Sequence, residues 1–118
     1  MEVLSEDFPI IKWAALLKGC LEVFQMAKIF YWECKELKLP HYLKDQLLRA
    51  SSSVALNIAE GAGKRTPQDQ ARFYAIALGS LRECQAILEL QRIETSSLIN
   101  HLDRIGAILF SITRKYTK

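Results

Sequence analysis

The stretch Asn57–Pro67, NIAEGAGKRTP, decides the fold, because it can be read as a phosphate-binding loop or as a turn between two helices. A phosphate-binding loop has the form GxxxxGK followed by Ser or Thr, and it lies between a strand and a helix. Here Lys64 is followed by Arg65, and Ile58 stands where the first glycine belongs. The residues before the stretch repeat with helical spacing. The sequence therefore favours a turn between helices over a nucleotide site.

The first half of this turn suits the end of a helix. Gly61 and Gly63 can adopt the left-handed conformation that closes many helices. Lys64 and Arg65 follow them, where cations interact favourably with the negative end of the helix dipole. We therefore expect a helix to end here through a left-handed glycine.

The second half suits the start of the next helix. Thr66 is predicted to be the N-cap, and Pro67 fits the first helical position. Asp69 stands at the third position, as in an acidic variant of the capping box. The turn is thus predicted to reverse the chain direction between two helices.

Apolar residues recur every three or four positions along the chain, and no stretch alternates as a strand does. Ser96 is a predicted N-cap. Gly79 is expected to have a packing reason, because glycine costs a helix interior about 1 kcal/mol relative to alanine. The spacing predicts one domain over residues 1–118 with helices at about 9–38, 40–61, 67–93 and 96–116. The predicted fold is an all-α, antiparallel up-down-up-down four-helix bundle.

The predicted turn sets a register between the second and third helices, in which facing residues have numbers that add to about 132. Asn57 is then expected near Phe73 at the edge of the core, where its amide needs a partner. Opposite charges are predicted to meet in two pairs, Glu60 with Arg72 and Arg49 with Glu83.

Composition is that of a folded, mildly basic protein. The 118 residues are 50% hydrophobic and 25% charged, with a formal net charge of +3. The cysteines Cys20, Cys34 and Cys84 occupy apolar helical positions without a CxxC pair, which predicts a reducing, cytoplasmic environment. The chain opens on acidic residues instead of a basic-then-apolar leader, and charges interrupt the apolar runs, so no membrane span is expected.

The central half of the chain carries two specific motifs. One is QLxRAxxSVxxNIAEG, from Gln46 to Gly61, and the other is RFxxIAxGSLxE, from Arg72 to Glu83. In these motifs the chain resembles the four-helix-bundle family of proteins encoded within intervening sequences of 23S rRNA genes. The resemblance implies a ring-like homopentamer and a role in binding nucleic acid, with no established catalytic residues. A related branch is formed by the accessory variability proteins of diversity-generating retroelements, which work with a reverse transcriptase and RNA but are strongly basic.

The first predicted helix has a second apolar stripe beside its core stripe, more surface than one helix needs to cover a core. A symmetric oligomer would bury the excess. The interface residues predicted on this basis are Trp13, Leu16, Val23 and Phe30. The alternative is that the helix lies deeper in its own bundle.

Basic residues predict a nucleic-acid contact, most simply with structured RNA. They form two clusters, expected at opposite ends of the bundle, that a ring of subunits would repeat. The clusters are Lys64 with Arg65, and Arg114 with Lys115 and Lys118. Both clusters could instead simply solvate helix ends and complement their dipoles. Another alternative is a protein-binding adaptor for a nucleic-acid enzyme.

Catalysis finds little support in the sequence. His41 and His101 stand alone, without the spacing of metal ligands. Cys84 has no histidine nearby in the sequence, and Glu60 and Glu83 are expected to pair with arginines. The sequence therefore predicts a non-enzymatic protein without cofactor or metal.

Overall fold

The computed structural model describes residues 18–115, and within them it contains four α-helices and no strand. The helices are α3 (Lys18–Lys35), α4 (His41–Ala62), α5 (Pro67–Leu90) and α6 (Ser96–Thr113). This confirms the predicted all-α four-helix bundle. The predicted start of the first helix lies outside the described residues, as does the predicted end of the last.

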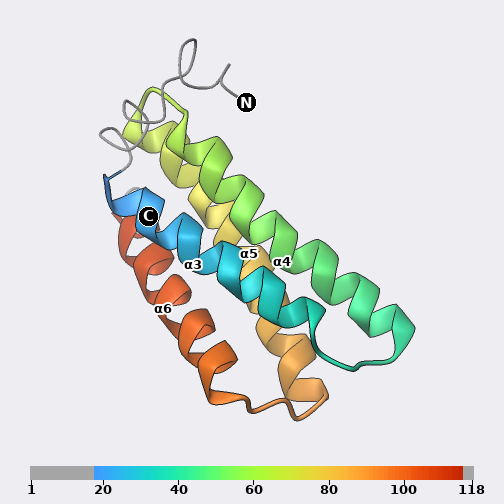
Figure 1. Cartoon of the computed structure of the whole chain (residues 1–118). Coiled ribbons are helices and arrows are strands. Elements are labelled where there is room, and N and C mark those ends of the chain that lie inside the picture. Colours follow the sequence, from blue (N-terminus) through green and yellow to red (C-terminus); the bar gives the residue numbers. More distant parts are fainter. Residues whose placement is uncertain (1–17, 116–118) are drawn as a thin grey trace, which may run out of the picture.

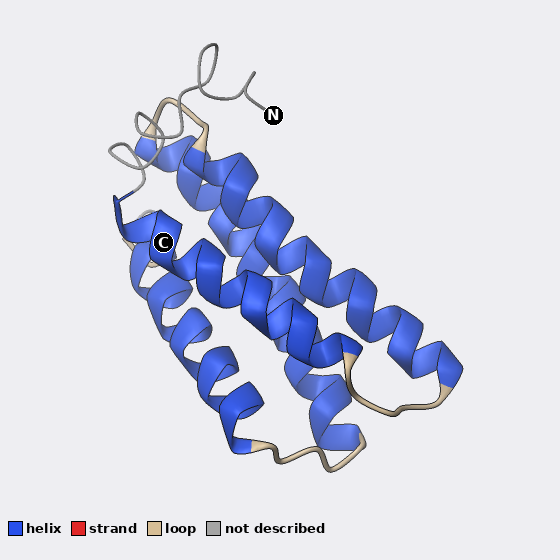
Figure 2. Cartoon of the chain, viewed as in Figure 1, coloured by secondary structure: helices blue, strands red, loops and turns tan. Residues whose placement is uncertain are grey.

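The helices run antiparallel, and short connections join them (Figure 2). Each helix packs against its neighbours in chain order, and α3 closes the ring by packing against α6. Figure 1 shows the α4–α5 turn, the beginning of α3 and the end of α6 at one end of the bundle. The α3–α4 and α5–α6 connections lie at the other end.

One core runs along the bundle, because each helix turns an apolar stripe inward. The largest side chains with almost no exposed surface are Phe30 from α3, Leu47 and Ile58 from α4, Tyr74 and Leu88 from α5, and Leu98, Ile105 and Leu109 from α6. Together they bury the apolar surface that the sequence spacing assigned to the four helices.

The end of α4 differs from the prediction of a left-handed glycine. Gly63 is the C-cap with φ −87° and ψ −2°, a right-handed conformation. No glycine among the described residues has a positive φ. The helix instead tightens into i→i+3 hydrogen bonds, from the Gly63 amide to the Glu60 carbonyl and from the Lys64 amide to the Gly61 carbonyl.

Gly61 has a different reason to be glycine, namely space. A Cβ built at Gly61 would lie 2.7 Å from Cε1 of Tyr74 and 3.0 Å from Cβ of Phe73. The first distance is shorter than carbon atoms show in proteins and the second is very tight, so a side chain at residue 61 would force the Tyr74 ring or α5 itself to shift away from α4. The glycine therefore sets the spacing of the two helices at the turn.

The start of α5 confirms the predicted cap. The hydroxyl of Thr66 accepts a hydrogen bond of 3.1 Å from the Asp69 amide, and Pro67 is the first helical residue. The side chain of Gln70 donates to the Lys64 carbonyl at 3.1 Å, which ties the turn to the first turn of α5.

The end of α5 carries the left-handed residue of this part of the chain. Arg92 has φ 56°, the Ile93 amide donates to the Leu88 carbonyl, and the Arg92 amide donates to the Glu89 carbonyl. This pair of bonds is a Schellman motif. It ends α5 at Leu90, three residues before the predicted boundary.

Two smaller predictions also need correction. Ser96 is the first residue of α6, not its cap: Thr95 occupies the N-cap position, without a side-chain hydrogen bond. A Cβ built at Gly79 would meet nothing within 4 Å, so Gly79 has no packing reason among the described residues.

Candidate functional site

The polar residues of the two sequence motifs meet along one seam between α4 and α5. The Ser53 and Ser80 hydroxyls are 2.9 Å apart, and their numbers add to 133, close to the predicted register. The side-chain amide of Asn57 donates to the Ser53 carbonyl at 2.9 Å and to the Ser53 hydroxyl at 3.0 Å. The predicted need of Asn57 for a partner is therefore met within its own helix.

A surface hollow of about 390 Å³ opens in this seam beside the Ser53–Ser80 contact, toward the beginning of α4. The side-chain amide of Gln46 donates to the Glu83 carboxylate across it at 3.2 Å. Arg49 is paired with Asp45 at 2.9 Å, and this hydrogen bond raises the pKa of Arg49, with a smaller contribution from the charge of Glu83. The lining residues are Tyr42, Gln46, Arg49, Ala50, Ser53, Ser80 and Glu83. Arg49 and Glu83 share the hollow, but the predicted ion pair between them is replaced by Arg49–Asp45 and Gln46–Glu83.

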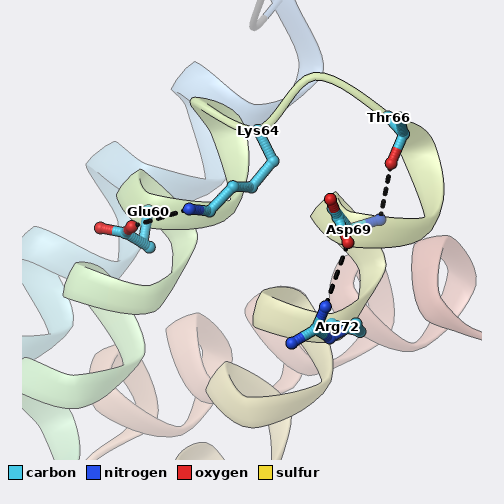
Figure 3. A network of polar contacts seen from close by, with 5 residues as sticks. All are labelled: Glu60, Lys64, Thr66, Asp69 and Arg72. Atoms are coloured by element: carbon cyan, nitrogen blue, oxygen red, sulfur yellow. Dashed lines mark hydrogen bonds and ion pairs between the residues drawn. The ribbon is translucent and has the colours of Figure 1, made fainter.

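The second predicted pair, Glu60 with Arg72, is wrong in the same way. Glu60 pairs with Lys64 at 3.2 Å, and Arg72 pairs with Asp69 at 3.1 Å. Figure 3 shows that each ion pair stays on its own side of the turn. Charged side chains three or four residues apart on a helix are neighbours already, so they need no precise interhelical register to meet.

Two of the predicted interface residues belong to the bundle's own core. Val23 is 1% exposed and Phe30 is fully buried within the single chain. The alternative of a deeper helix therefore holds for these positions, and the prediction that they contact another subunit is wrong. Trp13 and Leu16 lie outside the described residues.

Large apolar side chains are instead exposed on the outer surface of α4 and α5. Leu56 and Ile76 each lie about one turn from the Ser53–Ser80 contact, in the same direction along the bundle. Tyr42 lines the hollow at its other end, and Leu90 is the residue that the register places opposite Tyr42, since their numbers add to 132. Their exposed fractions are 70% for Tyr42, 65% for Leu56, 51% for Ile76 and 72% for Leu90. We call these four residues the outer α4–α5 face; helical spacing combined with the register could have found it.

The two basic clusters lie at the same end of the bundle, contrary to the prediction. A chain that reverses three times brings its second turn and its last helix end to one side, as Figure 1 shows. Lys64 lies there with its ammonium 3.2 Å from Glu60 and 4.9 Å from the Phe73 ring centroid. We call the described residues of this group the basic end: Lys64, Arg65, Arg114 and Lys115. Lys118 lies outside the described residues.

The residues weighed for catalysis are placed unfavourably for it. Burial raises the pKa of the Cys34 thiol to about 12 and raises the pKa of Cys84 as well, so neither is a ready nucleophile. His101 contacts Glu33 at 2.9 Å, whereas His41 is exposed at the start of α4. The described residues hold no group of three or more His, Cys, Asp or Glu side chains suited to a metal ion.

Fold and seam together define a four-helix-bundle protein whose middle helices are joined by a polar, motif-bearing seam. The sequence matches the family model described as 23S rRNA-intervening sequence protein over residues 19–111, and the chain belongs to this family. No curated protein and no solved structure matches the sequence. Of the helices described, none combines the length and apolar character needed to cross a membrane.

Proposed function

We propose that the protein is a non-enzymatic, self-associating binding protein whose basic end contacts nucleic acid, most simply structured RNA. The observation that carries this proposal is the shared location of the two basic clusters. Phosphate contacts release counterions and therefore add to affinity, so cations on one surface act together in a way that separated pairs do not. Clusters at opposite ends of the bundle could not contact one nucleic acid together, whereas clusters at the same end can.

Within the basic end, three side chains are best suited to contact phosphate. Lys64 is already engaged by Glu60 and the Phe73 ring. Arg65, Arg114 and Lys115 are exposed, and none forms an ion pair with another described residue. The chain's net charge of +3 is modest, so one copy offers few phosphate contacts. Repetition of the basic end by self-association would multiply them.

The outer α4–α5 face is the surface that we assign to self-association, in place of Val23 and Phe30. It combines four exposed large apolar side chains with a polar hollow between them. Exposed apolar groups that recur along one face are typical of protein contacts. A pentamer, which the resemblance implies, is the expected assembly; light scattering should give a multiple of the 13.5 kDa chain mass. The double variant Leu56→Asp/Ile76→Asp should yield monomers that remain helical.

The RNA contact is tested by charge reversal. Arg65→Glu/Arg114→Glu should weaken binding to a hairpin RNA and reduce the slope of log affinity against log salt by about 1 for each lost phosphate contact. The matched control is Arg82→Glu/Arg104→Glu, which makes the same charge change on exposed positions away from the basic end. Equal effects of the two double variants would contradict a localised contact.

The alternative function is an adaptor that binds a nucleic-acid enzyme without touching nucleic acid. The outer α4–α5 face supports it, because the same apolar residues could receive a different protein. Purified protein that binds no RNA even at low salt, and that is a monomer in light scattering, would favour the adaptor. The similarity to the accessory proteins of retroelements stays a prediction and would be in keeping with either function.

A further inference from the structure

A second surface, on α3, combines aromatic rings with lysines. The Lys28 ammonium lies 5.9 Å from the Phe24 ring centroid and 5.5 Å from that of Trp32. The Lys35 ammonium lies 5.5 Å from the Tyr31 ring centroid. Residues four apart lie one above another on a helix, so these side chains form one continuous strip. We call Phe24, Lys28, Tyr31, Trp32 and Lys35 the α3 strip.

The strip is partly supported by the core but remains open to solvent. Phe24 and Tyr31 are half-buried, and Phe24 packs against the hydrophobic core. Trp32 is 53% exposed, an unusual fraction for the largest side chain of a folded domain. Each lysine lies within cation–π distance of a ring, a contact that weakly favours this arrangement of the strip at an exposed site.

Charge on the strip selects an anionic partner. It contains two lysines and no carboxylate. Glu33 of the same helix turns toward α6, where it accepts a 2.6 Å hydrogen bond from Ser97, and the exposed Glu36 lies beyond the strip, past the end of α3. A ligand that covers the strip would therefore meet aromatic faces and ammonium groups together. Unpaired nucleotides offer matching groups, a flat base and a phosphate, and base–aromatic stacking is the usual contact of single strands.

The strip also lies within reach of the basic end. The beginning of α3 lies at that end of the bundle (Figure 1). At 1.5 Å per residue, Phe24 is about 9 Å and Trp32 about 21 Å along the axis from the first residue of α3. A strand bound by phosphate contacts at the basic end can thus continue along α3.

We infer that the α3 strip is a stacking site for unpaired bases of the nucleic acid, with Trp32 as the main platform. This inference rests on the proposed function and adds the structural class of the ligand. Recognition of RNA loops and single strands commonly proceeds by such stacking, which a duplex cannot offer because its bases are already stacked.

The test uses the fluorescence of Trp32. The chain has two tryptophans, so Trp13→Phe leaves Trp32 as the single reporter. Titration with a short unstructured oligoribonucleotide should quench its emission saturably, whereas a duplex of the same length should not. Trp32→Ala should weaken single-strand affinity by roughly 5- to 150-fold and leave duplex affinity unchanged. The control Ile29→Ala removes another exposed apolar side chain of α3, one that is not aromatic and lies outside the strip, and should change neither affinity.

Three outcomes would overturn the inference, and they are distinguishable. Salt-dependent RNA binding without quenching, and with equal loss for single strand and duplex, would leave the proposed function intact and remove the stacking site. Absence of any salt-dependent binding would remove both. Shielding of Trp32 from acrylamide before RNA is added, together with monomer formation by Trp32→Asp, would show that a second copy covers the strip.

Discussion

The turns at the two ends of α5 solve the same problem with opposite residues. Gly61 lies in the last turn of α4 and Gly63 in the α4–α5 turn, yet neither has a positive φ. The α5–α6 turn has no glycine, yet its Arg92 has φ 56°. In this bundle the glycine is present where two helices need room, and the left-handed residue is present where a Schellman motif needs its geometry.

The two requirements differ in energy. A side chain at Gly61 would overlap Tyr74, and overpacking of a tight contact typically costs about 1–3 kcal/mol. A non-glycine residue in the left-handed region costs about 1–2 kcal/mol, which the two backbone hydrogen bonds at Arg92 offset. Position 61 therefore tolerates less change than position 92.

The largest effect is expected from Gly61→Ala. The added Cβ would lie 2.7 Å from Cε1 of Tyr74, so the buried Tyr74 ring or α5 itself must shift near the turn. We expect the free energy of unfolding to fall by about 1–3 kcal/mol, measured by urea denaturation at fixed protein concentration.

Gly79→Ala is the matched control for that substitution. Its Cβ meets nothing within 4 Å, so helix propensity alone predicts a gain of about 1 kcal/mol. A protein with Gly61→Ala as stable as the parent would show that the close approach at the turn is not required.

The caps of α5 and α6 offer the next comparison. Thr66 accepts a hydrogen bond from the Asp69 amide, whereas Thr95 has no side-chain cap bond. Thr66→Ala should therefore lower the free energy of unfolding by about 1 kcal/mol, and Thr95→Ala by less than about 0.5 kcal/mol. Equal losses for the two variants in urea denaturation would contradict this difference between the caps.

Arg92→Gly should have a smaller, opposite effect. Relief of the left-handed backbone, worth about 1–2 kcal/mol, exceeds the conformational entropy cost of glycine, about 0.5–1 kcal/mol. A net gain of about 0.5–1 kcal/mol and a higher Tm in thermal unfolding are expected. A loss of stability for Arg92→Gly would show that the arginine side chain stabilises the turn.

Gly63→Ala tests the other turn. Gly63 is exposed with φ −87°, which alanine adopts, so no loss of stability is expected.

These turns also show what sequence reasoning could reach. Helix number, helix spacing and the Thr66 cap follow from local patterns, because periodicity and capping depend on residues within one turn of each other. The register was close, as the Ser53–Ser80 contact shows. The role of Gly61 could not be read locally, because it depends on Tyr74 from the next helix.

The candidate site was predicted less well than the fold. Val23 and Phe30 were assigned to an interface because apolar periodicity cannot distinguish burial within a chain from burial between chains. The prediction that the basic clusters lie at opposite ends was wrong, although the order of four antiparallel helices is enough to place the second turn and the end of α6 at the same end. Trp32 was missed because no pattern in the sequence reports that a tryptophan is 53% exposed.

The smallest expected effect concerns the charges beside the α4–α5 turn, and it tests whether register depends on them. A double-mutant cycle of Glu60→Gln with Lys64→Gln should give a coupling of about 0.3–0.5 kcal/mol, the usual value for an exposed helical pair. The cycle of Glu60→Gln with Arg72→Gln should give none, because Arg72 pairs with Asp69 at 3.1 Å. If the second coupling exceeded the first, the charges would act across the turn and help to align α4 with α5. If it did not, the alignment of α4 with α5 would be attributed to the close approach at Gly61 and to the hydrogen bond between Ser53 and Ser80. Both contacts are uncharged, so salt should not change them.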